Sequence, residues 1–475
     1  MPEPHPSRRP LLIFTAYSLV TLLFTGPLVF RLGSSLYGHE LVGFNIDPYA
    51  EMDCFLAVRQ VYLNHHGLLF SLFIHPAVAY PGALLTGLFN EAAAFNILLL
   101  LSFPLAGLFT YLLAFQLTGH SLASFFAGLI YAFSPYHWVH AYYHLSLAQI
   151  QWFPLYLLAL FLFTRRSSIP RAGLVLVSLA LLLFTNYYYA LFALLLTVFF
   201  LGYHGSYLLL FRAKAGVSAR PFWLLVGILF SGSILFLLLV FPYLGYVYQN
   251  LPALAARYGD LLRYSSRPWG FIFPPLDNPF LGWIGRSHIL SRLAGGTLVE
   301  HTLYPGVIPV LLAIAAGWGW RKKGGPHGPV LTSYSFLFLW LLIGLALVLS
   351  LPPVMTVGGL TMRMPSHYLY QAFPMFRSYA RFGLLIYLSL ALLAAGGLTR
   401  LFRRYSHKRW IPVLVFLLLF LEYTNIPPWR IRPLKPGILK HPSEISATTK
   451  DPGRTEEGSW GGLRTTGNKT LDDDR

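Results

Sequence analysis

The stretch Ala93–Leu117, AAFNILLLLSFPLAGLFTYLLAFQL, decides the kind of fold that this chain adopts. It contains no Asp, Glu, Lys or Arg, and the turn Thr118-Gly119-His120 separates it from the next apolar run. A helix that crosses a bilayer needs about 20 predominantly apolar residues. Because the apolar residues are continuous and do not alternate with polar ones, as they would in a transmembrane barrel, the stretch predicts a membrane-spanning helix.

The composition of the whole chain agrees with this prediction. Of its 475 residues, 56% are hydrophobic and 11% are charged, whereas a soluble domain carries about 25% charged residues. The net charge is +18, but the basic residues fall in short clusters between apolar runs, which indicates membrane topology and not a nucleic-acid surface. The single Cys54 excludes an intrachain disulfide and a thiolate zinc cluster. We therefore expect an all-α integral membrane protein.

The apolar runs predict about 11 membrane-spanning helices within residues 1–423. We expect them near residues 10–30, 93–117, 120–135, 172–185, 190–211, 222–246, 301–320, 334–351, 382–398 and 411–423, with a fourth span that follows an interfacial segment at residues 136–147 and ends at residues 165–166. The fifth and sixth are separated at Asn186-Tyr187-Tyr188-Tyr189. Residues 424–475 are rich in Pro, Gly, Thr and charge, so we expect a disordered polar tail there.

The positions of the lysines predict the orientation of the chain in the membrane. The loops around Arg165, Lys214, Lys322 and Lys408 hold every lysine that precedes the tail. Loops rich in Lys and Arg stay in the cytoplasm, so the amino terminus is expected inside and the carboxy terminus outside, in a bacterial cytoplasmic membrane. Three loops are then extracytoplasmic: residues 31–92, 247–300 and 352–381. Treating the interruption at Asn186 as one continuous helix would place Lys322 outside, which this rule disfavours.

Acidic residues between the first and last spans occur in or beside the predicted outer loops. They are Glu40, Asp47, Glu51, Asp53 and Glu91 in the first loop, and Asp260, Asp277 and Glu300 in the second. Carboxylates are costly near lipid, so their presence in an apolar chain suggests a site. Asp47 and Glu51 are four residues apart and would share one face of a helix. Pro48 favours a helix start at Asp47, ahead of a surface-lying helix over Tyr49–Leu69.

Two interpretations of Asp47 follow from its place at a helix start. Its carboxylate could act as a general base on an incoming hydroxyl. Alternatively, Asp47 is a helix N-cap and Glu51 and Asp53 are solvated charges, an interpretation that spacing alone slightly favours. The spacing is not that of a paired-aspartate metal motif, so a divalent metal is less well supported than a base.

Basic side chains in the outer loops are arginines without lysines. Arg377 and Arg381 flank Ser-Tyr-Ala at the mouth of the tenth span, where they could bind a lipid phosphate; ordinary snorkelling towards headgroups is the alternative. His137, His140 and His144 would share a helical face. Three histidines can bind zinc, but in this Tyr- and Trp-rich segment an interfacial role is favoured, with His144 able to hydrogen-bond a sugar or phosphate.

Several short segments, in order along the chain, resemble the GT-C superfamily of membrane glycosyltransferases, and more closely its bacterial YfhO-like and uncharacterised multi-span members. They are Asp47-Pro48, Tyr80-Pro81-Gly82, Ala94-Phe95-Asn96, residues 127–136 (AGLIYAFSPY), His144-Leu145, residues 151–155 (QWFPL) and residues 376–382 (FRSYARF). The resemblance implies a catalytic acidic residue in the first outer loop. Asp47 is the first candidate for this residue, and Glu51 is the second. It also implies that Arg377 and Arg381 bind a carrier phosphate and that Glu300 and His144 line the site. The chain departs from the superfamily in lacking an adjacent pair of acids at Asp47 and a folded outer domain after the last span.

The expected function is an inverting glycosyltransferase that moves a sugar from a polyprenyl-phosphate carrier to an extracytoplasmic glycan, lipid or protein. Membrane lipids are its other partners, and no nucleic acid, cofactor or metal is implied. Two alternatives remain. A lipid or polysaccharide transporter would need a continuous polar path across the spans, which the sequence does not show. A non-catalytic assembly factor on the same scaffold would leave Asp47 facing away from any cavity.

Overall fold

The computed structural model describes residues 9–38, 47–63, 75–215, 218–287, 289, 298–317, 331–424 and 431–435, and most of them are helical. Seven helical stretches in this part of the chain are long and apolar enough to cross a membrane. They are Pro10–Val29, Glu91–Thr118, Leu145–Arg165, Tyr187–Phe211, Arg220–Phe241, Ser333–Ser350 and Tyr379–Arg404. Their number and length indicate a multi-pass integral membrane protein.

Five apolar helices are shorter. They are α3 (Pro76–Leu85), α5 (Ser121–Ala132), α9 (Ile169–Thr185), α16 (Val307–Gly317) and α20 (Trp410–Tyr423). The last four coincide with expected spans, yet the described part of α16 has 11 residues and accounts for about 16 Å of the ~30 Å hydrocarbon core. A total of about eleven spans therefore remains a prediction. The break at Asn186 is confirmed, because α9 ends at Thr185 and α10 (Tyr187–Ala215) starts immediately after it.

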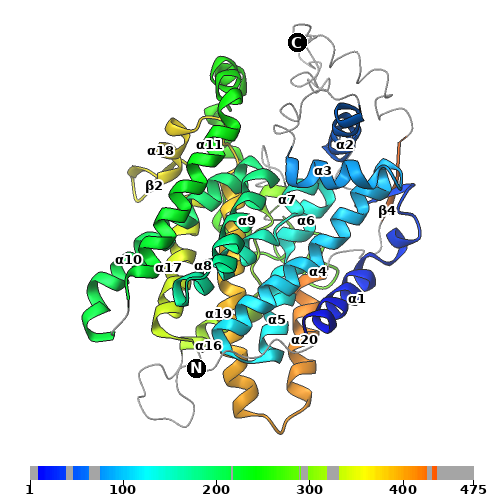
Figure 1. Cartoon of the computed structure of the whole chain (residues 1–475). Coiled ribbons are helices and arrows are strands. Elements are labelled where there is room, and N and C mark those ends of the chain that lie inside the picture. Colours follow the sequence, from blue (N-terminus) through cyan, green and yellow to red (C-terminus); the bar gives the residue numbers. More distant parts are fainter. Residues whose placement is uncertain are drawn as a thin grey trace.

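The centre of the molecule is α19 (Gly383–Arg404), whose apolar stretch is entirely buried. It packs against α16, α17 (Ser333–Ser350), α5 and α4 (Glu91–Thr118), as Figure 1 shows. The approach to α16 is close, because a Cβ atom at Gly397 would clash with the carbonyl oxygen of Leu312. At the periphery, α11 (Arg220–Leu254) leaves Leu235, Leu238 and Phe241 exposed. An exposed apolar surface of this kind is expected of a helix that faces lipid.

The predicted outer loops contain short elements of their own. The first holds α2 (Asp47–Leu63) and α3, and the second holds α12 (Tyr258–Arg263), α13 (Pro268–Ile272) and α15 (Leu298–His301). The third holds the hairpin of β2 (Val354–Val357) and β3 (Leu360–Arg363), then α18 (Pro365–Ala372) and the 3₁₀ helix η3 (Tyr379–Phe382). In Figure 1, α2, α3, β2 and α18 lie in the upper part of the molecule, and the carboxyl-terminal ends of α10 and α19 lie in the lower part. The first and third loops therefore share one end of the helical bundle.

Helix α2 starts at Asp47, as Pro48 predicted, and is described as far as Leu63; residues 64–69 of the expected helix lie outside the described part of the chain. Tyr49, Met52, Phe55 and Val58 form its buried face, which packs on α3 and α4. The helix is therefore anchored through an apolar face with a period near 3.6 residues.

The structure corrects the prediction of a disordered tail for residues 431–435. Strand β4 (Ile431–Pro433) pairs antiparallel with β1 (Ser35–Tyr37), with Leu36 opposite Arg432. The low apolar content of this segment suggested disorder. A short strand can nevertheless be held by backbone hydrogen bonds to the unpaired edge of another strand, and this does not require apolar side chains. Residues 425–430 and 436–475 lie outside the described chain.

Candidate functional site

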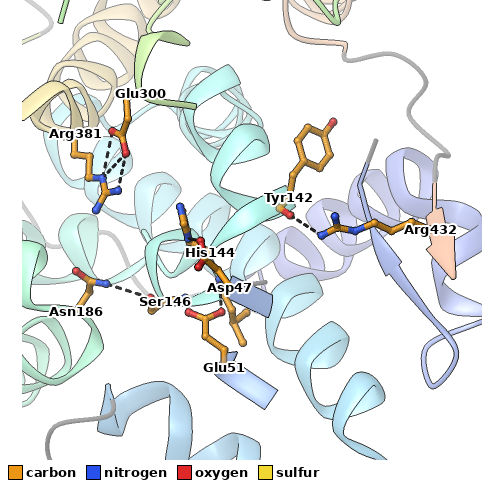
Figure 2. Close-up of polar contacts among 10 residues, drawn as sticks. Asp47, Glu51, Tyr142, His144, Ser146, Asn186, Glu300, Arg381 and Arg432 are labelled. Carbon is orange, nitrogen blue, oxygen red and sulfur yellow. Dashed lines mark hydrogen bonds and ion pairs between the residues drawn. The ribbon is translucent and has the colours of Figure 1, made fainter. Parts of the chain in front are cut away.

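Asp47 and Glu51 both contact one short segment, residues 144–146, which connects α6 (Pro135–Tyr143) to α7 (Leu145–Ala148) and α8 (Trp152–Arg165). Oδ2 of Asp47 lies 3.1 Å from Nδ1 of His144. The Glu51 carboxylate accepts the amide hydrogens of Leu145, at 2.7 Å, and Ser146, at 2.9 Å. Figure 2 shows the two carboxylates side by side against this segment. The prediction that they share a helix face is confirmed.

The Asp47–His144 pair is the more accessible part of this arrangement. The Asp47 side chain is 47% exposed and that of His144 is 23% exposed. An ionised carboxylate can only accept a hydrogen bond, so Nδ1 of His144 carries the proton in this contact. The Nε2 atom of a neutral imidazole is then an acceptor. The contact fixes the orientation of the carboxylate and of the imidazole relative to each other, and a carboxylate held in this way can accept a proton.

Glu51 has a different environment, because its carboxylate holds the first turn of α7. Burial raises the pKa of Glu51, and the hydrogen bonds from Ser146 and Leu145 together with nearby His144 oppose that rise. Backbone amides at a helix start carry partial positive charge and favour an anionic acceptor. Glu51 is thus not the solvated charge that one interpretation of the sequence expected; it joins α2 to α7.

The helix break at Asn186 connects this segment to the third outer loop. Nδ2 of Asn186 donates to Oγ of Ser146 at 3.1 Å, and Oδ1 accepts the amide hydrogen of Tyr188 at 2.9 Å. The Tyr188 hydroxyl accepts the amide hydrogens of Arg377 and Ser378, each at 3.2 Å. The sequence signalled Asn186 and Tyr188 only as an interruption of an apolar run, so their bridging contacts were missed.

Arg381 and Glu300 form a buried ion pair. Nη2 of Arg381 lies 2.6 Å from Oε1 of Glu300, and Nε lies 3.0 Å from the same oxygen. The side chains are 11% and 4% exposed, and the guanidinium stacks 4.3 Å from the centre of the Tyr188 ring. Figure 2 shows the pair set apart from Asp47. The charge of Arg381 is therefore matched by a carboxylate of the protein itself.

Arg377 is more accessible than Arg381. Its side chain is 53% exposed, its Nη1 atom lies 3.9 Å from Oδ2 of Asp260, and the guanidinium lies 5.2 Å from the centre of the Tyr264 ring. An exposed pair at this distance contributes at most about 1 kcal/mol, so a phosphate could replace Asp260 at small cost. The two arginines that the sequence grouped together thus have different surroundings.

The three histidines do not share one helix face, because α6 ends at Tyr143 and His144 is extended beyond it. His137 contacts the Ala132 carbonyl through Nδ1, at 2.6 Å, and Oγ of Ser102 through Nε2, at 3.1 Å, which is a structural role. His140 is fully buried, with its ring 4.3 Å from that of Tyr136. Over the described residues, no group of three or more His, Cys, Asp or Glu side chains could hold a metal ion.

The fold and this junction define a multi-pass helical membrane protein in which polar residues of several segments meet beside the apolar bundle. The chain belongs to the DUF6311 family, whose model, described as a domain of unknown function, matches residues 68–424. No match was found among curated proteins. The matched stretch contains His144, Glu300, Arg377 and Arg381, whereas Asp47 and Glu51 precede it. The family description assigns no activity, so the resemblance to GT-C glycosyltransferases remains a proposal.

Proposed function

We propose that this protein is a membrane glycosyltransferase that moves a sugar from a polyprenyl-phosphate carrier to an extracytoplasmic glycan, lipid or protein. The observation that carries the proposal is the contact between Asp47 and His144, a partly exposed carboxylate–imidazole pair on a chain of apolar helices. A polyprenyl tail needs an apolar environment, and a glycosyl acceptor needs a base at the polar edge of that environment. The pair and the exposed face of the bundle meet both requirements.

The proposed reaction is a single displacement with inversion at the anomeric carbon. The acceptor hydroxyl attacks that carbon and forms the new glycosidic C–O bond, and its proton passes to the Asp47 carboxylate. The bond from the anomeric carbon to the phosphate oxygen breaks, and polyprenyl phosphate leaves with the electron pair. His144 orients Asp47 through its Nδ1–H and stabilises the negative charge of the base before transfer. No general acid is required, because the leaving group is already an anion.

The surroundings of the other residues give them separate roles in this proposal. Arg377 is the better candidate for the carrier phosphate, because it is half exposed and only loosely paired. Arg381 and Glu300 form a buried ion pair against Tyr188, and Glu51 holds the segment that bears His144. The proposed orientation places the amino terminus in the cytoplasm and the site outside, in a bacterial cytoplasmic membrane with about eleven spans.

The test uses purified protein in proteoliposomes with a panel of labelled polyprenyl-phosphate hexoses and pentoses and a mixed glycan and lipid acceptor extract. We expect transfer by the wild type and a loss of at least about 100-fold in Asp47→Asn, because a positioned base contributes about 10²–10⁴-fold. Glu91→Gln is the matched control, since it removes another first-loop carboxylate, at the start of α4. Full transfer by Asp47→Asn would contradict the assignment of the base.

The phosphate assignment has its own measurement. Affinity for the labelled carrier should fall in Arg377→Ala and stay near the wild-type value in Arg363→Ala, which removes an exposed arginine of the β2–β3 hairpin in the same loop. Unchanged affinity in Arg377→Ala would contradict a role in phosphate binding. Carrier binding without transfer by the wild type, over the whole panel, would favour the assembly-factor alternative over the enzyme.

A further inference from the structure

The segment Ile431–Lys435, which we call the strap, follows the last helix and lies outside the family-matched residues. It pairs with β1, where Ser35 lies opposite Pro433 and Tyr37 opposite Ile431. The amide of Leu434 extends the pairing by donating to the Ser34 carbonyl at 3.1 Å. Figure 1 shows β4 beside β1, along the flank of the molecule near α1 (Arg9–Val29).

The strap contacts both elements that carry the Asp47–His144 pair. The amide of Lys435 donates to the Tyr49 hydroxyl at 3.0 Å, and Tyr49 follows Asp47 in the first turn of α2. Nη2 of Arg432 donates to the Tyr142 carbonyl at 3.3 Å, and Tyr142 lies in the last turn of α6, just before His144. Figure 2 shows Arg432 reaching Tyr142 from the strand.

The surroundings of Arg432 hold its side chain in this position. Gly38 has a positive φ of 150°, and a Cβ atom added there would lie 3.3 Å from Nε of Arg432, so glycine leaves room for the guanidinium. The Tyr142 ring stacks on the Tyr37 ring, with centroids 5.1 Å apart, and Tyr37 lies opposite Ile431 in the strand pairing. Strap, β1 and the end of α6 therefore form one packed unit.

The Asp47–His144 contact cannot fix its own geometry, because partly exposed ion pairs contribute only about 0–1 kcal/mol. Glu51 holds α2 at one point, one turn beyond Asp47, through the amides of Leu145 and Ser146. The rest of α2 is held by its apolar face on α3 and α4 and by the hydrogen bond from Arg59 to the Thr86 carbonyl, so the first turn, which bears Asp47, is the part whose position the strap can adjust. The hydrogen bond from Lys435 to Tyr49 adds a second point at the start of the helix, and Arg432 ties that point to α6.

We propose that the strap positions the Asp47–His144 pair by fixing the start of α2 against the end of α6, with Arg432 as its main positioning residue. Arg432 does not touch the pair and acts through Tyr142. The proposal concerns the geometry of the pair and holds whatever reaction the pair performs. In this proposal, the geometry of the site depends on residues that lie outside the family-matched stretch.

The test measures a distance in the full-length chain. Spin labels at Leu63→Cys, exposed at the far end of α2, and Leu122→Cys, exposed on α5, report the position of α2 against the bundle in a Cys54→Ser background. We expect a narrow distance distribution with the natural strap. It should broaden or shift in Arg432→Ala and in Tyr49→Phe, which removes the hydroxyl that accepts from Lys435.

Pro433→Ala is the matched control, because it changes an exposed strap residue without removing a hydrogen-bond donor. It should leave the distribution unchanged. The combined variant Arg432→Ala, Tyr49→Phe gives the largest expected change, and a distribution in that variant identical to the wild type would overturn the proposal. If Arg432→Ala does not fold, Tyr49→Phe alone decides, since it removes a single oxygen atom. Because the readout is a distance, failure of the glycosyltransferase proposal does not affect the result.

Discussion

The Nδ1 atom of His144 lies 3.1 Å from Oδ2 of Asp47, and the two residues that follow His144 donate their amide hydrogens to Glu51. Two carboxylates one helical turn apart thus contact three consecutive residues of another segment. The first contact is half exposed, and the second is a charge-assisted pair of hydrogen bonds at the start of a helix. This difference separates a residue suited to chemistry from one that holds the structure.

The Asp47–His144 pair should behave as one functional unit. We expect His144→Gln to lower the transfer rate about 10- to 100-fold, less than Asp47→Asn, because the base remains but loses its orienting partner. The double variant should be no slower than Asp47→Asn alone, since groups that act together are not additive. Initial rates in proteoliposomes measure this. Losses that multiply in the double variant would show that the two side chains act independently.

Glu51 should matter for stability in proportion to its hydrogen bonds. Glu51→Ala leaves the amides of Leu145 and Ser146 without their acceptor, and we expect a loss of about 1–3 kcal/mol. Glu51→Gln keeps an acceptor oxygen and should lose less. Thermal unfolding in detergent compares the two variants. Glu91→Gln is the control, because it removes only the interaction of a carboxylate with the helix dipole, which contributes about 0.3–1 kcal/mol. A Glu51→Ala protein as stable as that control would exclude the anchoring role.

The Glu300–Arg381 pair should show strong energetic coupling. Removing one partner leaves a buried charge uncompensated, which costs about 3–5 kcal/mol, so Glu300→Gln and Arg381→Gln should each lower the midpoint of denaturation strongly. The double variant leaves neither charge and should lose less than the sum of the two. A double-mutant cycle measures the coupling. Simple additivity would mean that the ion pair contributes little, despite its 2.6 Å contact.

Asp277 should make stability depend on pH. Burial raises its pKa from 3.8 to about 6. Because the folded protein holds the proton of this carboxyl group more tightly than the unfolded chain does, the protonated group favours folding. This contribution to the free energy of unfolding is fully present at pH values below the pKa of the unfolded chain, and it is lost as the pH rises through about 6. Asp277→Asn removes this ionisation and should be more stable than the wild type at pH 8, by at most about 3 kcal/mol, with no such gain at pH 4. Unfolding midpoints across this range test it, and an equal difference at both ends would contradict it.

The sequence predicted the helices because a membrane-spanning helix is a local property of the chain. A continuous apolar run needs no partner to be recognised, and this was enough to locate the break at Asn186. The same local reasoning placed Asp47 and Glu51 on one face of α2, since residues four apart on a helix are neighbours. It also noted the Asp-Pro start of that helix.

The partners of the polar side chains could not be predicted in the same way. Arg377 and Arg381 are four residues apart and looked equivalent, yet one is half exposed and the other is buried against Glu300. Tyr188 looked like part of a helix interruption, but it receives two amide hydrogens from the third outer loop. The strap was expected to be disordered, although it pairs with β1. Each of these outcomes depends on which distant segment lies opposite.

The sequence by itself determined that this is a multi-pass helical membrane protein, and it identified Asp47 as a residue to test. The physical reason is that hydrophobic length and helical spacing are encoded by neighbouring residues. Only the tertiary structure decided that Asp47 meets His144, that Glu51 holds α7 and that Arg432 ties the strap to Tyr142. Hydrogen bonds and ion pairs act over about 3 Å. The partners of these side chains therefore depend on how distant segments pack together, and this packing cannot be read from neighbouring residues.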